Sequence, residues 1–281
     1  MNQKSTILVT GSNGQLGQEI QELTKLSLPG FLDFNFIFTD RSQLDLGDND
    51  SIKTFFEKNQ VDFCINCAAY TAVDKAETEK EICEQINSFA VAELAKQCQK
   101  QNATLIHIST DYVFDGSKNS PYLETDQTNP INHYGQTKLG GENLALQNNP
   151  KTLIVRTSWV YSKKFGKNFY KTVLRLASEK SQIKIVSDQI GCPTDANDLA
   201  KILLKMVIKI SQDSTFKNFG IYHFSGDKIM SWFDFAKKIV AENNLNCEVL
   251  PIPSSEFPTP TKRPMYSVMG KNKIAGEFLL V

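Results

Sequence analysis

The stretch STILVTGSNGQLG, residues 5–17, joins a short apolar run to three glycines spaced three residues apart. Such a run is typical of a buried strand, and the glycines mark a turn into a helix. Gly11, Gly14 and Gly17 allow positive φ and let a phosphate approach the backbone. The helix that follows adds free N–H groups and a partial positive charge. The stretch predicts the opening of a dinucleotide-binding fold, although a turn that needs glycine for its shape alone has the same pattern.

Strand and helix patterns alternate from this stretch to residue 160. We expect strands at 5–11, 34–40, 61–69, 104–110 and 152–160, and helices at 15–26, 51–59, 77–101 and 134–147. Strands that are apolar throughout, with helices between them, are typical of a parallel sheet covered on both faces. The sequence predicts an α/β fold with a doubly wound parallel sheet, a Rossmann domain over residues 1–160.

The pattern changes after Val160. We expect helices at 168–178, 197–210 and 231–243, an extended segment at 183–189 and a strand at 220–226. Residues 161–281 are predicted to form mainly a smaller, interleaved substrate-binding lobe, with elements near 197–226 returning to the Rossmann domain. Five prolines between residues 251 and 264 exclude a regular helix there and favour a wrapping segment or loop.

Composition narrows the class of protein. The chain is 41% hydrophobic and 22% charged with zero formal net charge, which gives no support to a nucleic-acid partner or an electrostatic membrane anchor. We see no signal peptide and no apolar run near the ~18 residues that span a bilayer. Six scattered cysteines fit a reducing compartment, so we predict a cytoplasmic protein. Cys64 and Cys67 lie in an expected strand, which favours core thiols over a metal or redox site.

The expected strand ends supply further nucleotide contacts. Asp40 can accept the adenosine ribose hydroxyls, whereas Arg41 can meet a 2′-phosphate, so NADH and NADPH both stay open. Asp45 and Leu46 lie in the next loop, near the adenine in such folds, although a helix cap or surface turn also explains them. The predicted cofactor-binding residues are Gly11, Gly14, Gln15, Leu16, Gly17, Asp40, Arg41, Asp45, Leu46, Ala68, Ala69, Tyr70, Thr71, Tyr134 and Lys138.

Tyr134 and Lys138 are four residues apart on an expected helix and share one face. An ammonium group near a phenol lowers its pKa, which suits a proton donor to a carbonyl oxygen. Thr110 ends the fourth strand, where its hydroxyl can bond to the same oxygen. In an arbitrary protein such a pair is more often a chance surface pair. Beside a dinucleotide site it predicts a carbonyl reductase, with Tyr134, Lys138 and Thr110 catalytic.

The three histidines are isolated in the sequence. His107 and His223 fall in expected strands and are predicted to be hydrogen-bonded structural imidazoles, whereas His133 is a candidate for lining the site.

Segments that match a known family run in order along nearly the whole chain: GSNGQLGQE (11–19), TDYVFDG (110–116), YGQTKLGGE (134–142), RTSWVY (156–161) and RPMYS (263–267). On these segments the chain resembles the extended short-chain dehydrogenase/reductase superfamily and, within it, the dTDP-4-dehydrorhamnose reductase family. The resemblance implies NAD(P)H-dependent reduction of the C4 ketone of dTDP-4-dehydro-L-rhamnose to dTDP-L-rhamnose. It implies Tyr134 as the proton donor and a substrate set of Thr110, Asp111, Tyr112, Trp159 and Arg263.

Alternatives to this function stay open. Trp159 can stack on a sugar or be a buried core aromatic. The fold also serves a non-catalytic dinucleotide-binding regulatory subunit, which the retained Thr110, Tyr134 and Lys138 argue against, and other nucleotide-sugar reductases or epimerases. The resemblance implies a dTDP-sugar partner, leaves a homodimer open, and allows magnesium without any residue to assign it to. Because the chain stops soon after RPMYS, we assign no dimer contact or metal ligand to its end.

Overall fold

The structure of the protein is a computed structural model that describes residues 4–26 and 34–279. A six-stranded sheet with the order β10-β5-β4-β3-β1-β2 forms its centre, and all neighbouring strands are parallel. The strands are β1 (Ser5–Thr10), β2 (Phe34–Thr39), β3 (Phe63–Asn66), β4 (Thr104–Thr110), β5 (Thr152–Thr157) and β10 (Gly220–His223). The predicted doubly wound α/β fold is confirmed. Its strand order reverses between β1 and β3, where this fold class binds ligands.

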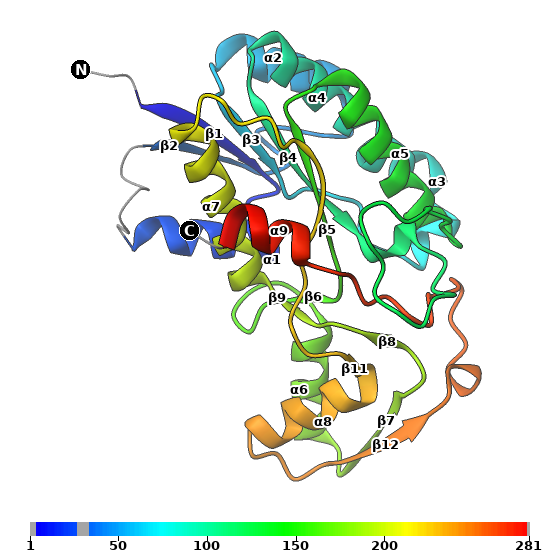
Figure 1. Cartoon of the computed structure of the whole chain (residues 1–281). Coiled ribbons are helices and arrows are strands. Elements are labelled where there is room, and N and C mark those ends of the chain that lie inside the picture. The colour runs from blue at the N-terminus through cyan, green and yellow to red at the C-terminus, as the bar shows by residue number, and fades with distance from the viewer. Residues whose placement is uncertain (1–3, 27–33, 280–281) are drawn as a thin grey trace.

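Helices cover both faces of this sheet (Figure 1). One face carries α1 (Gln15–Lys25), α7 (Ala196–Gln212) and the C-terminal turns α9 (Asn272–Ile274) and η5 (Ala275–Leu279), and the other carries α2 (Asn49–Lys58), α4 (Ala90–Lys100) and α5 (His133–Asn148). Successive strand residues face opposite layers, so Ile7 and Val9 pack into the first core and Leu8 into the second. This two-sided burial explains why the strands are apolar throughout.

The helix expected at 77–101 is not regular, so that prediction is wrong in its details. It consists of a 3-10 turn η1 (Lys75–Glu77), α3 (Lys80–Glu84), a π turn η2 (Gln85–Phe89) and α4. In the π turn, the Asn87 amide donates to the Tyr70 carbonyl and to the Thr137 hydroxyl at 3.1 and 3.2 Å. A Cβ at Gly141 would lie 2.1 Å from the Asn87 carbonyl, so α5 packs directly on this turn. The irregularity links the end of β3 to α5, and π turns are frequent at functional sites.

Three strands end three residues earlier than predicted. β3 stops at Asn66, β5 at Thr157 and β10 at His223, and the short β6 (Val160–Tyr161) follows Trp159. Trp159 has a φ of 51°, which an extended strand cannot accommodate. The residues after each strand therefore leave the sheet at its carboxyl edge, where their side chains can line a cavity.

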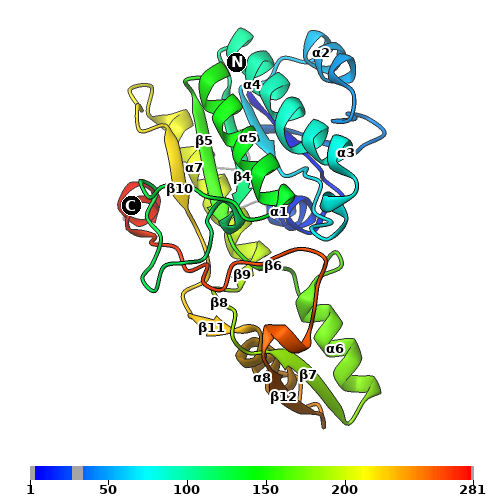
Figure 2. The same cartoon turned by 90° about the vertical axis from the view of Figure 1, so that its right-hand side faces the viewer.

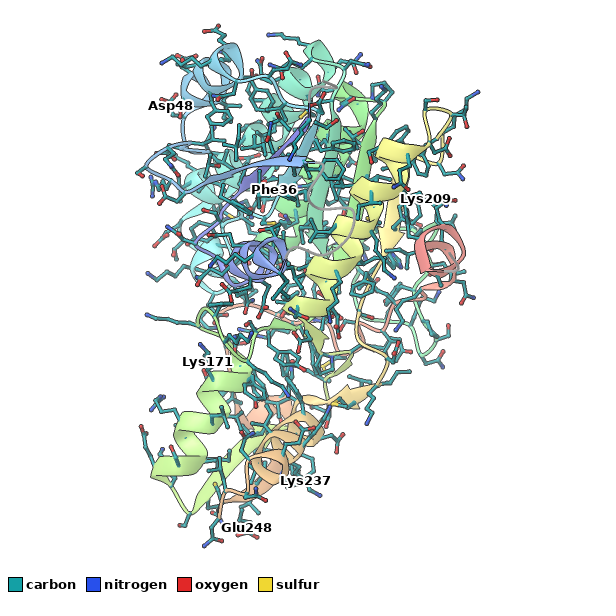
Figure 3. All side chains as sticks on the ribbon, turned by 90° about the vertical axis from the view of Figure 1, so that its left-hand side faces the viewer. Phe36, Asp48, Lys171, Lys209, Lys237 and Glu248 are labelled. Carbon is teal, nitrogen blue, oxygen red and sulfur yellow. The ribbon has the colours of Figure 1, made fainter. Side chains whose placement is uncertain are left out.

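A smaller lobe lies beyond that carboxyl edge (Figures 1 and 2). It contains α6 (Phe169–Glu179), α8 (Trp232–Glu242) and the parallel pair β7 (Gln182–Val186) and β12 (Glu248–Ile252), packed around a core of its own. Small strand pairs connect it to the sheet: β8 (Ile190–Gly191) with β11 (Met230–Ser231), and β6 with β9 (Thr194–Asp195). Figure 3 shows Lys171, Lys237 and Glu248 on this lobe, well apart from Phe36 in the sheet.

The proline-rich segment is more regular than expected at its start. Pro251 belongs to β12, and a 3-10 turn, η4 (Ser254–Glu256), follows. Proline is tolerated in an edge strand because its missing N–H can face outward. No helix within 4–26 or 34–279 is long and apolar enough to cross a membrane.

Candidate functional site

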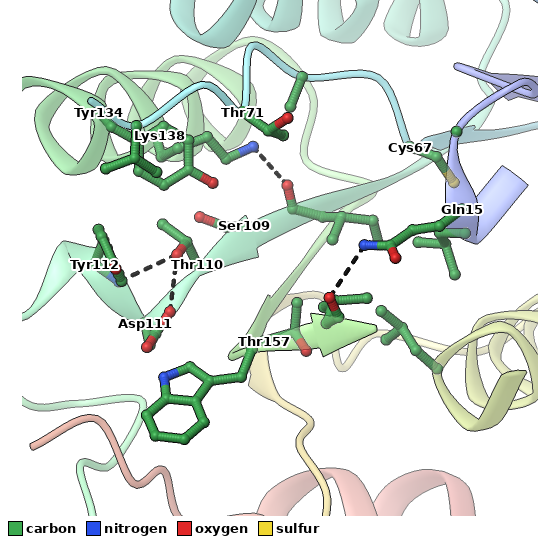
Figure 4. Close-up of a pocket in the computed structure, with 18 of the residues that line it drawn as sticks. Gln15, Cys67, Thr71, Ser109, Thr110, Asp111, Tyr112, Tyr134, Lys138 and Thr157 are labelled. Atoms are coloured by element: carbon green, nitrogen blue, oxygen red, sulfur yellow. Dashed lines mark hydrogen bonds between the residues drawn. The ribbon is translucent and has the colours of Figure 1, made fainter. Parts of the chain in front are cut away.

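A cavity of about 650 Å³ lies at the carboxyl edge of the sheet, bordered by the smaller lobe (Figure 4). It brings together residues that are up to about 250 positions apart, because parallel strands end at one edge of a sheet. The predicted site residues that line it are Gly11, Gly14, Gln15, Leu16, Ala68, Ala69, Thr71, Thr110, Asp111, Tyr112, Tyr134, Lys138, Trp159 and Arg263.

The glycine-rich turn forms one end of the cavity. Gly11 has a φ of 64°, and a Cβ there would lie 2.8 Å from the Ala68 backbone. A Cβ at Gly17 would lie 2.6 Å from the Gly11 carbonyl, so Gly17 packs the turn tightly without lining the cavity. Gly14 caps α1 without a side chain, which leaves the first N–H groups of the helix free for a ligand. This cradle fits the diphosphate of a dinucleotide.

The other predicted cofactor residues lie outside the cavity lining. Asp40 accepts a hydrogen bond from the Asn13 amide of the turn at 2.9 Å, and hydrogen bonds from Ser42 lower the pKa of its carboxyl. The Arg41 Nε lies 3.3 Å from the Asp45 Oδ2. Two further side chains point elsewhere: Leu46 is buried in the core, and the Tyr70 hydroxyl donates to Glu79 at 2.6 Å.

Two local features place Tyr134 in the first turn of α5. Asn132 caps the helix by accepting a hydrogen bond from the Gly135 N–H at 2.8 Å. A Cβ at Gly135 would lie only 2.2 Å from the Tyr112 carbonyl, so α5 begins directly against the segment that follows β4. The Tyr112 and Tyr134 rings meet edge to face at 5.7 Å. Both rings therefore line the cavity beside Thr110 and Asp111 (Figure 4).

The Lys138 ammonium group is held against β4. Its Nζ donates to the Ile108 carbonyl at 2.6 Å and lies 3.2 Å from the His107 Nε2. Burial of the side chain lowers the pKa of Lys138 to about 8. The other imidazole nitrogen of His107 lies 3.0 Å from the Asn66 amide, so the prediction that His107 is a hydrogen-bonded structural residue is confirmed.

The pKa of the Tyr134 phenol differs from our expectation. Burial first, and then the charge of Asp111, raise its pKa above the ordinary value near 10. The prediction that the Lys138 charge lowers this pKa is wrong for this structure, because the ammonium bonds to β4 instead. Tyr134 therefore holds its proton firmly, which suits an acid that gives the proton up only when negative charge develops on a nearby oxygen.

Asp111 carries an unused acceptor. Its Oδ1 accepts from the Thr110 hydroxyl at 2.9 Å, but its Oδ2 is buried without a hydrogen-bond partner among the described residues. Burial raises the pKa of this carboxyl to about 6. Asp111 lines the cavity, so its carboxyl group can take part in hydrogen bonds to a ligand there.

Several other predictions need correction. Cys67 packs against the first core as expected but also lines the cavity, while Cys64 is fully buried as expected. His133 does not line the cavity; its backbone N–H donates to Glu77. Both His223 nitrogens are buried without a hydrogen-bond partner in the described chain, and burial lowers the pKa of that imidazole to about 3.

The cavity residues that the sequence did not reveal include Lys167 and Trp232. Lys167 lies in the loop before α6, and Trp232 is the first residue of α8. A lysine within SKKFGKNF and a tryptophan after a helix cap are ordinary sequence features, so only the fold shows that they reach this cavity.

The fold and the cavity define an oxidoreductase of the short-chain dehydrogenase/reductase class, in which a dinucleotide cradle faces a tyrosine and a lysine on one helix. More specifically, the chain belongs to the family described as "RmlD substrate binding domain", whose model matches residues 5–281.

Similar proteins support this assignment. The chain is 39% identical to a dTDP-4-dehydrorhamnose reductase of Aggregatibacter actinomycetemcomitans over 97% of this chain and 92% of that protein. It resembles the crystal structure of a dTDP-4-dehydrorhamnose reductase from Bacillus anthracis in complex with NADP, with a TM-score of 0.89, 36% identity and coverage of 98% and 93%. A Clostridium acetobutylicum ortholog has the same TM-score, 40% identity and coverage of 98% and 92%.

Proposed function

We propose that this protein reduces the C4 ketone of dTDP-4-dehydro-L-rhamnose to dTDP-L-rhamnose with NADPH or NADH. One observation carries the proposal: a single cavity contains a diphosphate cradle at Gly11 and Gly14 and a protonated phenol at Tyr134. The family membership of the chain and the name that its relatives share point to the same reaction.

Three side chains have different roles in reduction of the ketone. The bound dinucleotide supplies the hydride to C4. Tyr134 donates its proton to the ketone oxygen, and its raised pKa keeps that proton in place until charge develops. When the ketone binds, the Thr110 hydroxyl donates to the same oxygen instead of to Asp111. The Lys138 cation on the next turn of α5 stabilises negative charge in the cavity.

The remaining cavity residues hold the nucleotide sugar. The Asp111 carboxylate in the cavity wall accepts a hydrogen bond from a sugar hydroxyl. The Arg263 Nη2 pairs with Asp74 at 3.0 Å, and its Nη1 lies 3.4 Å from the Tyr112 hydroxyl, so the guanidinium group is fixed in the cavity wall. A fixed cation at this place suits the diphosphate of the substrate.

The choice between NADH and NADPH depends on two residues just outside the cavity lining, Asp40 and Arg41. Asp40 favours the ribose of NADH, and the exposed Arg41 favours the 2′-phosphate of NADPH. The B. anthracis relative is in complex with NADP. No cluster of three or more His, Cys, Asp or Glu side chains in the described part of the chain suits a metal ion, so magnesium is assigned to no residue.

Location and assembly belong to the proposal too. The six cysteines are all free, which supports a cytoplasmic location. A homodimer stays a prediction, which light scattering of the purified protein can measure.

A turnover assay tests the proposed function. Purified protein is mixed with enzymatically made dTDP-4-dehydro-L-rhamnose, and NADPH or NADH absorbance is followed, with UDP-4-keto sugars as the comparison. We expect cofactor consumption and dTDP-L-rhamnose formation. Binding of NAD(P)H without any consumption would favour the regulatory subunit instead, and faster turnover of another nucleotide sugar would favour a different reductase of this class.

Lys167 is expected to strengthen binding of NADPH. Gly166 packs on Gln15 at the start of α1, and the Asn168 amide donates to the Gln15 Oε1 at 3.0 Å, which holds the loop over the diphosphate cradle. Lys167 lines the cavity and makes no ion pair with any described residue. Since a partly exposed charge contributes up to about 1 kcal/mol, Lys167→Ala should raise the Kd of NADPH about fivefold.

Fluorescence titration measures this effect, with Lys164→Ala as the matched control. Lys164 carries the same charge in the same loop but does not line the cavity. Equal Kd values for the two variants would remove Lys167 from the cofactor site.

A further inference from the structure

A chain of hydrogen bonds crosses the sheet on the face that α5 covers. Thr10 ends β1, Asn66 ends β3 and His107 lies in β4, and each is the register partner of the next. The Thr10 hydroxyl donates to the Asn66 Oδ1 at 2.6 Å, and the Asn66 Nδ2 lies 3.0 Å from the His107 Nδ1. The His107 Nε2 lies 3.2 Å from the Lys138 Nζ. The chain therefore connects the strand before the glycine-rich turn to the lysine of the cavity.

All four side chains of this chain are buried. Thr10 and Lys138 are 1% and 2% exposed, and Asn66 and His107 are fully buried. Bulk water cannot replace a partner at such positions, so each polar atom depends on the hydrogen bonds that the protein supplies. The direction of each bond can therefore be worked out from donors and acceptors.

The backbone N–H of Ala68 fixes the orientation of the Asn66 amide. This N–H can only donate, and it lies 3.3 Å from the Asn66 Oδ1 and 3.4 Å from the Thr10 hydroxyl oxygen. Exchange of the two amide atoms would place an NH₂ group against the Ala68 N–H, two donors facing each other. The Asn66 Nδ2 is therefore the atom that faces His107, and it donates to the His107 Nδ1.

The position of the imidazole hydrogen follows from this bond. Burial, and then the charge of Lys138, hold the pKa of His107 well below its ordinary value, so the ring is neutral and has one N–H. Since Nδ1 accepts from Asn66, the hydrogen is on Nε2 and points at the Lys138 nitrogen. An ammonium group has no lone pair to accept it, whereas an uncharged amine has one. The chain of hydrogen bonds therefore favours the uncharged form of Lys138.

The Ile108 carbonyl completes the surroundings of the lysine nitrogen. It accepts from Lys138 at 2.6 Å, and an amine and an ammonium group can both supply that hydrogen. In the uncharged form, one hydrogen bonds to this carbonyl and the lone pair accepts from His107. One N–H remains for a ligand in the cavity, which Lys138 lines. The carbonyl thus fixes where the nitrogen lies, and His107 acts on its charge.

Other titratable groups also act on Lys138. Burial lowers its pKa to about 8, and Glu142 of α5 and Cys83 of α3 act in the opposite direction. Glu142 already pairs with Arg156 of β5, and Tyr134, one turn earlier on α5, keeps its proton. Lys138 makes no ion pair with any described residue. Its contact with the imidazole is therefore the side-chain hydrogen bond that differs between its two charge states.

We propose that His107 is a positioning residue for Lys138. The Asn66 amide aims the His107 Nε2–H at the lysine nitrogen, so the enzyme loses the lysine cation at a lower pH than it would without this donor. This inference rests on the proposed function for the reaction whose rate is followed. It places part of the control of the lysine charge inside the sheet, between the glycine-rich turn and α5.

The position of the imidazole hydrogen can be measured without substrate. The chain has three histidines, so nitrogen-15 NMR of labelled histidine gives few signals, and the signals that His107→Phe loses are those of His107. In wild type we expect a neutral ring with its hydrogen on Nε2, both below and above the pKa of Lys138. A hydrogen on Nδ1 would overturn the proposal.

The pH dependence of ketone reduction tests the effect on Lys138. His107→Phe keeps a ring and removes the N–H that faces the lysine. We expect the pH at which the rate falls to rise by about 0.5–1 unit, the effect of one hydrogen bond. His133→Phe, whose ring lies outside the cavity lining, is the matched control and should keep the wild-type pH dependence. An unchanged or lowered pH in His107→Phe would overturn the proposal.

A further variant tests the bond that sets the imidazole hydrogen. Asn66→Asp keeps the shape of the side chain but replaces the donor to Nδ1 by an acceptor, so the NMR signals of His107 should show a hydrogen on Nδ1. An Nδ1 still without hydrogen would remove Asn66 from this role. Absence of turnover in wild type would contradict the proposed function instead, and the NMR measurement would still decide how His107 faces Lys138.

Discussion

Replacement of Tyr134 by phenylalanine is expected to lower kcat by about 10²–10⁴-fold, the usual contribution of a positioned general acid. The variant loses the one hydroxyl that the proposal assigns as proton donor, while the glycine cradle at Gly11 and Gly14 is untouched. The Kd of NADPH should therefore change little. Stopped-flow or steady-state absorbance measures the rate, and fluorescence titration measures cofactor binding.

A control variant and the pH dependence of the rate test the role of Tyr134 further. Tyr170→Phe removes a hydroxyl from another buried tyrosine, in the core of the smaller lobe, and should retain the wild-type rate. In wild type, Lys138 titrates before Tyr134, because burial lowers the pKa of the lysine to about 8 and raises that of the phenol. The rate should therefore fall as the pH rises through about 8, where Lys138 loses its charge. A near-normal rate in Tyr134→Phe would remove Tyr134 from the acid role.

Replacement of Glu142 by leucine is expected to lower the free energy of unfolding by about 3–5 kcal/mol, because it leaves a buried cation unpaired. The Arg156 and Glu142 side chains are 3% and 1% exposed, and the Nη2–Oε2 distance is 2.6 Å. The Arg156 Nε donates to both carboxylate oxygens, and the Ser109 hydroxyl donates to the Oε1. These bonds join β4, β5 and α5, so they fix Thr110 relative to Tyr134.

Urea unfolding of single and double variants measures this contribution. Glu142→Leu combined with Arg156→Met removes both charges and should recover most of the lost stability, since buried ion pairs can be replaced by packed apolar side chains at little cost. Glu179→Ala, which breaks the exposed pair with Arg175, is the control and should change stability by less than about 1 kcal/mol. A double variant as unstable as the sum of the single variants would contradict the argument.

The central fold was predictable because its signals are local. The glycine turn after β1 and the apolar run of β4 each follow from short-range chemistry, and the observed strands fall at or within the predicted ranges. The edge that gathers Thr110 and Asp111 was predictable too, since parallel strands end together. The family segments added the cavity residues Trp159 and Arg263.

What the sequence could not show depends on contacts between distant segments. The π turn at Gln85–Phe89 follows from the contacts of Asn87 with Tyr70 and Thr137, which no helical periodicity reveals. Lys167 reaches the cavity only because its loop is tied to Gln15.

The sequence by itself determined the doubly wound sheet, the diphosphate cradle and the place of Tyr134 and Lys138 on one helix, because each depends on neighbours a few residues away. Only the tertiary structure decided that Lys138 bonds to β4, that the pKa of Tyr134 is raised, and that Trp232 stacks on Trp159. Each of these depends on burial and on side chains from other elements. Burial and such contacts exist only once the chain is packed.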